Sequence, residues 1–268
     1  MARPASTLLS RRPTQLVVAL LAVTFALVLV FGIVLIVHDS VTRIPRIRAL
    51  VNINGEANLP AWWNGALLMT IGFGALVARA FDIERAARRA WLTVAVTGFV
   101  LSLDETVALH ERMGQPVVEA GIRVPTFAWL VPGVVIGAAL FVALVAVGRG
   151  LPRRTRRWLL LALICYLAGA LGVEAINGTL RNADRLIYYW IGTTVEETVE
   201  MVSCVIAIGA IAGFIDDRMA TATGRRTEDL EVVGHGLAGR GHGPDPDAGA
   251  IGRLAERGRP QHQARVGP

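Results

Sequence analysis

Apolar runs and short polar segments alternate along most of the chain. A run of about 20 predominantly apolar residues is the length at which an α-helix crosses the hydrocarbon core of a bilayer. Six such runs lie at residues 15–37, 62–80, 91–110, 127–148, 158–177 and 192–215. The pattern therefore predicts an all-α, polytopic membrane protein built as a bundle of six transmembrane helices.

The two ends of the chain differ from this central part. Beyond about residue 220 the composition changes to Gly, Pro and Arg with few large apolar side chains, and such a segment cannot bury a core. We predict a cytoplasmic N-terminal segment over 1–14, a six-helix transmembrane domain over 15–215 and a disordered cytoplasmic tail over 216–268.

The distribution of arginine predicts the orientation of the bundle. All 27 basic residues are arginines, and they gather in the N-terminal segment, in the 79–90 and 149–157 loops and at the start of the tail. The alternate loops hold fewer, although the first of them has three. By the positive-inside rule both termini are cytoplasmic. We predict a multi-pass protein of the cell inner (plasma) membrane, with the lipid bilayer as its partner.

The net charge of +6 does not change this interpretation. The arginines are dispersed between apolar runs, so they do not form the single basic patch that a nucleic-acid partner would require. The tryptophans agree with the predicted span ends. Indole rings prefer the headgroup level of a bilayer, so we predict an interfacial position for all six: Trp62, Trp63, Trp91, Trp129, Trp158 and Trp190.

Acidic residues interrupt three of the six apolar runs. In the predicted orientation the third and fifth runs lead outward and the sixth leads inward. All the acidic residues then fall in the extracytoplasmic half of the bilayer: Asp104, Glu105 and Glu111 with His110 on the third run, Glu174 about one turn below the outer end of the fifth, and Glu196, Glu197 and Glu200 on the sixth.

Helical spacing also gathers these residues on faces. At about 100° per residue, the three glutamates of the sixth run fall within an arc of about 100°, and Ser203 and Cys204 continue that stripe. On the third run Asp104 and Glu111 lie nearly on one line. Lipid exposure of an ionisable side chain costs several kcal/mol, so such groups face a bundle interior or a water-filled cavity. We therefore predict that the three helices point these groups at one another.

Seven carboxylates cannot all stay ionised close together, so the site must share protons, recruit cations, or do both. Carboxylates with a histidine suit hard or borderline divalent metals such as Fe, Mn, Zn or Mg. The Glu-x-x-His motif of di-metal helix bundles is missing, and His38 is the candidate for a second histidine. We predict a metal site with the ligands Asp104, Glu105, His110, Glu174, Glu196, Glu197 and Glu200.

Three functions fit this pattern. In the first, a metalloenzyme acts on a lipid-soluble substrate, with His110 and Glu105 as catalytic residues and the metal as Lewis acid or oxidant. In the second, a transporter or channel uses the same carboxylates to carry a cation or to relay protons. The third is a non-catalytic membrane scaffold. The inner halves of the spans hold almost no ionisable groups, which favours a one-sided site over a transport path.

Structural explanations compete for individual residues. A buried partner for Asp104 would have to be Arg181 or Arg185. The first glutamates of the sixth run are also what the dipole of a helix N-terminus favours, although Glu200 lies beyond the first turn. Asn177-Gly-Thr matches an N-glycosylation acceptor on the outer side.

Three stretches together carry a resemblance: SLDETVALHE, then GALGVEA, then TTVEETVEM. The set resembles a family of uncharacterised bacterial multi-pass membrane proteins, in which a Ser-Leu-Asp-Glu…His-Glu span precedes a Gly…Glu span and a Glu-Glu-x-x-Glu span. It covers about residues 60–215. The resemblance implies that these acidic residues belong together and implies no activity.

Overall fold

The computed structural model describes residues 11–40, 45–53, 55 and 58–240, and within them every regular element is helical. The elements, in chain order, are α1 (Arg11–Ser40), α2 (Pro45–Val51), α3 (Leu59–Ala80), α4 (Arg85–Val107), α5 (Leu109–Arg112), α6 (Gln115–Glu119), α7 (Leu130–Val147), η1 (Gly148–Gly150), α8 (Arg153–Leu167), η2 (Ala168–Val173), α9 (Glu174–Asn182) and α10 (Leu186–Arg240). Of these, η1 is a 3₁₀ turn and η2 a π-helical turn.

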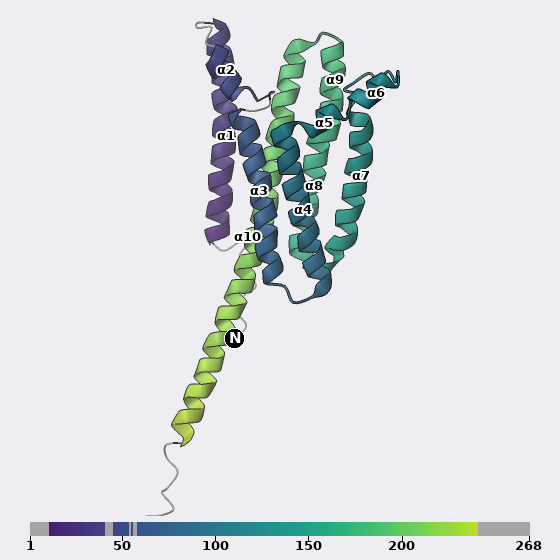
Figure 1. The fold of residues 1–268 in the computed structure, drawn as a ribbon. Coiled ribbons are helices and arrows are strands. Elements are labelled where there is room, and N and C mark those ends of the chain that lie inside the picture. Colours follow the sequence, from purple (N-terminus) through teal and green to yellow (C-terminus); the bar gives the residue numbers. More distant parts are fainter. Residues whose placement is uncertain (1–10, 41–44, 54, 56–57, 241–268) are drawn as a thin grey trace, which may run out of the picture. The chain divides into compact units, whose positions relative to one another are not determined.

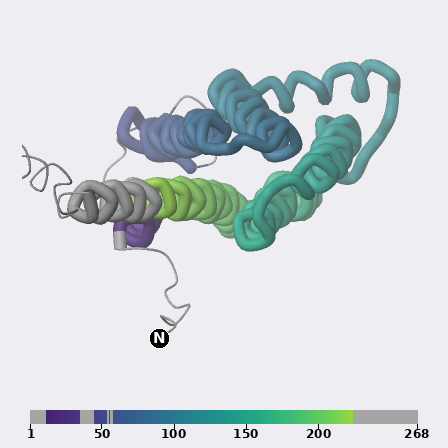
Figure 2. Tube along the Cα trace, turned by 90° about the horizontal axis from the view of Figure 1, so that it is seen from below, coloured from purple at the N-terminus to yellow at the C-terminus, as the bar shows by residue number. Residues whose placement is uncertain are grey.

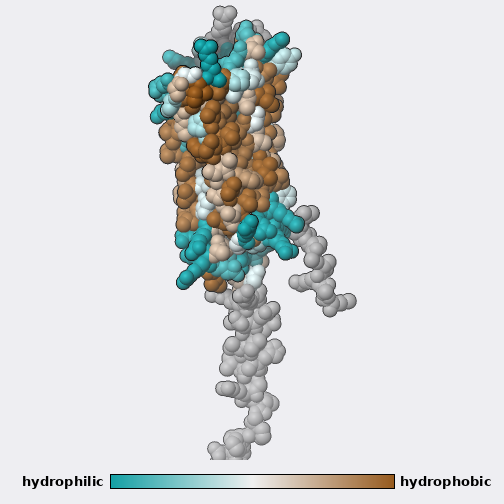
Figure 3. All heavy atoms as spheres, turned by 90° about the vertical axis from the view of Figure 1, so that its right-hand side faces the viewer, coloured by the Kyte–Doolittle hydropathy of each residue, from teal (hydrophilic) through white to brown (hydrophobic). Residues whose placement is uncertain are grey.

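Six helical stretches are long and apolar enough to cross a membrane, as the sequence predicts. They run over Arg12–Val34, Leu59–Ala80, Arg85–Val107, Leu130–Gly150, Arg153–Asn182 and Leu186–Thr223. Figure 3 shows an apolar belt on the visible face of the six-helix unit, with hydrophilic side chains at both ends of that belt. The predicted fold class is confirmed, and the chain is an integral membrane protein.

The chain divides into two compact units, residues 1–219 and 220–268. The first holds the bundle. In the second, α10 stays helical to Arg240 and so passes position 216, where we expected the disordered tail to begin. The stretch just past that boundary still contains good helix formers such as Met219, Ala220 and Ala222. Residues 241–268 lie outside the described part, so their disorder stays a prediction.

Helix α10 is the central helix of the bundle. Over half of its membrane-spanning stretch is buried, a larger share than in any of the other five spans, and Met201, Val205 and Ile208 belong to the core. In the view along the bundle, the α3–α4 pair lies above α10 and the α7–α8 pair lies to its right (Figure 2). A side chain that α10 presents at one level can therefore meet groups from α3, α4, α8 and α9.

Helices α3 and α4 pack closely because glycines face each other between them. A Cβ on Gly98 would lie 2.9 Å from the backbone nitrogen of Gly72 and 2.9 Å from the carbonyl oxygen of Leu68. Only glycine therefore permits this approach. This close packing holds α4, and with it the residues near its end, against α3.

The two ends of the bundle are named here by their elements. The upper end holds α2, α5 and α6, and the lower end holds the α3–α4 turn and η1 (Figure 1). At the lower end Asp82 is buried, accepting hydrogen bonds from Trp91 Nε1 at 2.8 Å and from Arg218 Nη2 at 2.6 Å. This group of three, the lower clasp, ties the α3–α4 turn to α4 and α10.

The lower clasp shows how Trp91 is held near the end of its span. Trp91 is fully buried and so faces the protein interior and not its surroundings, while its level in a bilayer stays a prediction. Its ring packs against Phe214, with 4.9 Å between ring centroids, while its N–H reaches the Asp82 carboxylate. A buried hydrogen-bond acceptor gives the indole N–H a better partner than the headgroup region does.

Candidate functional site

The structure brings the seven predicted site residues to the lining of one cavity at the upper end of the bundle. This acidic cavity has a volume of about 190 Å³, and Glu111, Trp129, Tyr166 and Thr193 also line it. Its predicted members come from four elements: Asp104 and Glu105 from α4, His110 from α5, Glu174 from α9, and Glu196, Glu197 and Glu200 from α10. Residues as far apart in sequence as Asp104 and Glu200 therefore meet at one level of the bundle.

Asp104 and His110 form a pair at the end of α4. The Asp104 carboxylate accepts the His110 backbone N–H at 2.8 Å through Oδ1, and Oδ2 lies 2.9 Å from His110 Nδ1. The imidazole packs edge-on against Trp129, with ring centroids 4.7 Å apart. With Nδ1–H donated to the carboxylate, the ring is held in the tautomer whose Nε2 carries the lone pair needed by a base or a metal ligand.

The chain conformation between these two residues differs from the prediction. Helix α4 ends at Val107, and Ala108 takes a left-handed conformation with φ 51° and ψ 50°. The expected continuous helix through residue 110, with Asp104 and Glu111 on one line, is therefore wrong. The Asp104 side chain satisfies the His110 N–H and so stabilises the turn that breaks the helix.

Glu196 and Glu200 are the most deeply placed carboxylates of the cavity, with 6% and 7% of their surface exposed. Their partners are amides. Asn177 Nδ2 donates to Glu196 Oε2 at 2.6 Å, and Asn64 Nδ2 lies 3.5 Å from Glu200 Oε2. Both asparagines are fully buried. An amide dipole compensates a buried carboxylate less completely than a positive charge does.

Glu174 from α9 and Glu196 from α10 both line this cavity. Two carboxyl groups can hydrogen bond only if one of them carries a proton. This part of the cavity is therefore suited to holding a proton between carboxyl groups, one of the two solutions that the sequence predicts.

Glu174 reaches its position through η2, the π-helical turn that precedes it. The sequence placed Glu174 about one turn below the outer end of its span, but α9 continues to Asn182, about 12 Å further along the axis. Within η2, Gly169 allows close packing on α10, because a Cβ there would lie 3.1 Å from Glu200 Cγ. Single π-helical turns within α-helices frequently occur at functional sites.

Arginine does not neutralise the buried carboxylates. The Arg181 guanidinium lies over the rings of Phe127 and Tyr189, at 5.7 and 5.9 Å from their centroids. Among the described residues, Glu174, Glu196 and Glu200 take part in no ion pair with a basic side chain. The suggestion that Arg181 or Arg185 pairs with Asp104 is not met either, because His110 occupies that role.

The expected metal ligands share the cavity without forming a finished coordination site. Within the part of the chain that the structure describes, no three His, Cys, Asp or Glu side chains are gathered closely enough to hold a metal ion. One further residue of the lining is Thr193, which is 4% exposed and whose buried Oγ1 has no hydrogen-bond partner among the described residues. The side chain of His38, the suggested second histidine, lies outside the described part.

Sequence reasoning missed four residues of this site: Asn64, Tyr166, Asn177 and Thr193. The signal for Asn64 was present, since an amide within the apolar stretch WWNGALL requires a buried partner. Asn177 was assigned to a glycosylation triplet, but it is fully buried against Glu196 and cannot accept a glycan. Nothing in the sequence separates Tyr166 or Thr193 from ordinary packing residues.

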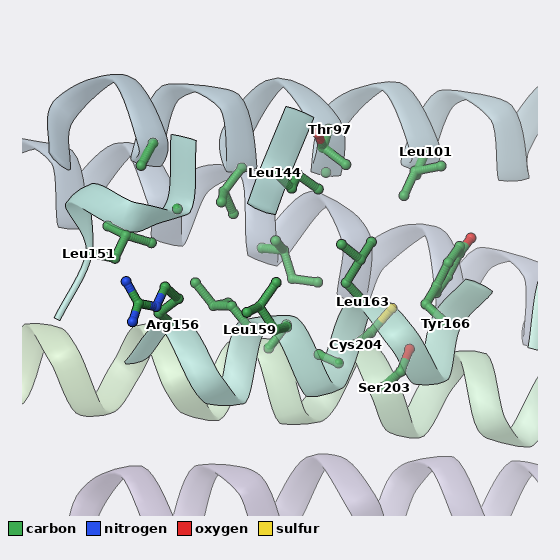
Figure 4. A pocket seen from close by; sticks show the side chains of 18 of the residues that line it. Thr97, Leu101, Leu144, Leu151, Arg156, Leu159, Leu163, Tyr166, Ser203 and Cys204 are labelled. Atoms are coloured by element: carbon green, nitrogen blue, oxygen red, sulfur yellow. The ribbon is translucent and has the colours of Figure 1, made fainter. Parts of the chain in front are cut away.

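A second cavity lies between α4, α7, α8 and α10, on the lower side of the acidic cavity (Figure 4). This apolar cavity has a volume of about 90 Å³ and is lined mainly by aliphatic side chains such as Leu144, Leu159 and Leu163. Tyr166 and Leu101 line both cavities. In Figure 4 these two residues lie at one end of the apolar cavity, and Arg156 lies toward the other.

Comparison with known proteins adds a family and no activity. No curated protein and no solved structure matches the chain. Residues 16–212 match the model of a domain of unknown function, DUF8692. The match spans all six membrane-crossing helices apart from the ends of the first and last. It covers most of the 268 residues, so the chain belongs to the DUF8692 family.

Proposed function

We propose that the acidic cavity is a cation-binding site. The observation that carries the proposal is the charge of its lining. Seven predicted site residues meet there, and the buried Glu196 and Glu200 and the half-buried Glu174 have no basic partner among the described residues. Burial of uncompensated carboxylates destabilises a fold unless a ligand or a proton neutralises them. Clusters of ionisable residues within a membrane bundle are typical of functional sites.

The unsatisfied Thr193 hydroxyl supports the same conclusion independently. A buried hydroxyl without a partner costs about 1 to 3 kcal/mol, and natural proteins rarely leave one in that state. Since Thr193 lines the cavity, a small rotation of its side chain would let a bound ligand or its hydration water supply the missing partner. An oxygen atom beside several carboxylates is also a suitable additional donor to a hard cation.

A divalent metal ion, Fe, Mn, Zn or Mg, is the first candidate cation. Glu197, Glu200 and His110 would be among its ligands, and the metal would supply Lewis-acid or redox chemistry when bound. Because the described side chains are not gathered into a coordination site, binding would require the carboxyl groups to move together and to release shared protons. The Asp104–His110 pair would then serve as ligand or general base.

The cavity lies at the upper end of the bundle, and the arginine distribution favours the extracytoplasmic side of the inner membrane for that end. Below it, the lining of the apolar cavity is almost wholly aliphatic, so no chain of ionisable groups continues toward the lower end at that place. This favours a one-sided binding or catalytic site over transport of the cation across the membrane.

The test is equilibrium binding of Mn²⁺ to the full chain in detergent, followed by electron paramagnetic resonance, together with elemental analysis of the purified protein. We expect saturable Mn²⁺ binding by the wild type, weakened about tenfold or more by Glu197→Gln and by Glu200→Gln. Glu119→Gln is the matched control, since Glu119 is exposed at the same end of the bundle and outside the acidic cavity. Absence of saturable Mn²⁺ binding by the wild type would contradict the assignment of a divalent metal ion to the cavity.

A further inference from the structure

The apolar cavity is elongated along the axis of the bundle. From Arg156 to Tyr166 on α8 it extends over about 15 Å of helix. Between these residues, Leu144, Leu159 and Leu163 provide an aliphatic lining (Figure 4). A small apolar cavity of this form has room for part of a hydrocarbon chain and offers almost no hydrogen-bonding partner to a polar ligand.

The upper end of the apolar cavity meets the acidic cavity at a small group of polar side chains. Tyr166 lines both cavities, and Ser203 and Cys204 lie beside it (Figure 4). Cys204 Sγ lies 3.8 Å from Asn64 Oδ1, and the same asparagine faces Glu200. The transition from hydrocarbon-like lining to carboxylate lining therefore occurs within about one helical turn of α10, between Glu200 and Cys204.

Charge distinguishes the outer ends of these two adjoining cavities, which share Leu101 and Tyr166 in their linings. The upper end has the carboxylates of Glu105, Glu197 and Glu200. The lower end has the Arg156 guanidinium, which makes no hydrogen bond or ion pair among the described residues and whose aliphatic stem lies against η1. A cationic group is attracted to the upper end and repelled from the lower one, whereas an anionic group would be drawn the opposite way.

We propose that the two cavities together bind an amphiphile with a cationic amine head, whose ammonium group lies in the acidic cavity and whose hydrocarbon chain passes Tyr166 into the apolar cavity. This rests on the proposed function, because it identifies the cation as organic and lipid-soluble. The amine satisfies the carboxylates and donates to the Thr193 hydroxyl without the converging ligand geometry that a metal requires.

The experiment uses the full chain in phosphatidylcholine nanodiscs with a long primary alkylamine that carries a photoreactive diazirine at the chain end remote from the nitrogen. Mass spectrometry locates the label after illumination. We expect labelling of residues toward the lower end of the apolar cavity, such as Leu159 and Leu144, in preference to lipid-facing residues such as Val135. A fatty acid with the same chain and diazirine is the charge control.

Two substitutions on one helix provide a matched pair. Leu163→Trp fills the apolar cavity and should reduce labelling there about tenfold, whereas Leu161→Trp, at an exposed position on α8, should leave it unchanged. Glu200→Gln should weaken it about tenfold through loss of the charged partner. Labelling spread evenly over lipid-facing residues, or insensitive to Leu163→Trp, would overturn the amphiphile proposal, and stronger labelling by the fatty acid would assign the cavity to an anionic lipid.

Mn²⁺ binding by the same variants separates the two proposals. If Leu163→Trp and the wild type bind Mn²⁺ equally while the amine shows no localised labelling, only the amphiphile proposal fails. If neither Mn²⁺ nor the amine binds to the wild type, both proposals fail. Localised amine labelling without Mn²⁺ binding would leave the cavity as a site for organic cations alone.

Discussion

Asp82 at the lower end and Glu200 at the upper end are carboxylates of nearly equal burial, with 4% and 7% of their surface exposed. Asp82 accepts a guanidinium hydrogen bond at 2.6 Å and an indole hydrogen bond at 2.8 Å. Glu200 has a single amide nitrogen at 3.5 Å and no basic partner among the described residues. The same chemical group is thus compensated by the fold at one end and left largely uncompensated at the other.

The difference indicates what each carboxylate is for. A buried acid that is paired with a cation and fully hydrogen-bonded contributes to stability, and its removal leaves other groups without partners. A buried acid that the fold does not pair lowers stability, and is retained where a ligand supplies the missing partner. Substitutions of the two carboxylates themselves should therefore change stability in opposite directions, and the predictions below test that contrast.

The largest effect is expected at the lower clasp. Asp82→Ala leaves the Trp91 N–H buried without an acceptor and Arg218 without its ion pair, so we expect a loss of about 3 kcal/mol in the free energy of unfolding. Unfolding titrations in mixed micelles measure it. Glu84→Ala in the same turn is the control and should change stability by less than about 0.5 kcal/mol, since Glu84 is exposed. Equal effects of the two substitutions would contradict a stabilising role for the Asp82 contacts.

An intermediate effect on stability is expected at Gly192, which packs against the Asn177 amide at the upper end. A Cβ on Gly192 would overlap Oδ1 of the fully buried Asn177, so Gly192→Ala must displace the partner of Glu196. We expect a loss of about 2 kcal/mol. Gly172→Ala, where an added Cβ meets nothing within 4 Å, should be close to neutral in the same titration. A neutral Gly192→Ala would mean that the amide contact does not position Glu196.

The smallest effect is expected at Glu200 and has the opposite sign. Glu200→Gln keeps an acceptor for Asn64 and removes a charge that lacks a basic partner, so we expect stability to stay equal or to rise by up to about 1 kcal/mol in the absence of ligand. The same unfolding titration measures the change. A loss as large as that of Asp82→Ala would show that Glu200 is structural and would end the contrast between the two ends.

The number of spans and the level of the acidic residues follow from patterns that act over whole helices. An apolar run of about 20 residues has one stable structure in a bilayer, and a carboxylate within it must face the interior. The sequence therefore predicts the six-helix bundle and the meeting of Glu174 with the α10 glutamates. These predictions depend on the period of the helix and not on any single contact.

Local breaks in the helices could not be predicted in this way. Alanine at position 108 does not favour a left-handed conformation. The turn is stabilised instead by the hydrogen bond between the His110 N–H and the Asp104 carboxylate. The burial of Trp91 was not predicted, because its hydrogen-bond acceptor, Asp82, lies in a turn nine residues earlier and meets it only in the folded bundle. Asn177 resembled a glycosylation site because its burial depends on α10, which follows it in the chain. Each of these features is decided by tertiary contacts.

The π-helical turn η2 makes the position of Glu174 depend on the number of residues in the turn. Its i→i+5 hydrogen bonding encloses one residue more than a regular α-helical turn does. Deletion of one residue between Ala168 and Val173 would restore an uninterrupted helix that still crosses the membrane, yet it would rotate the α8 and α9 faces relative to each other by about 100°. Glu174 would then turn away from Glu196. In this chain, a single-codon deletion in that turn would disrupt the acidic cavity while the six-helix topology persisted.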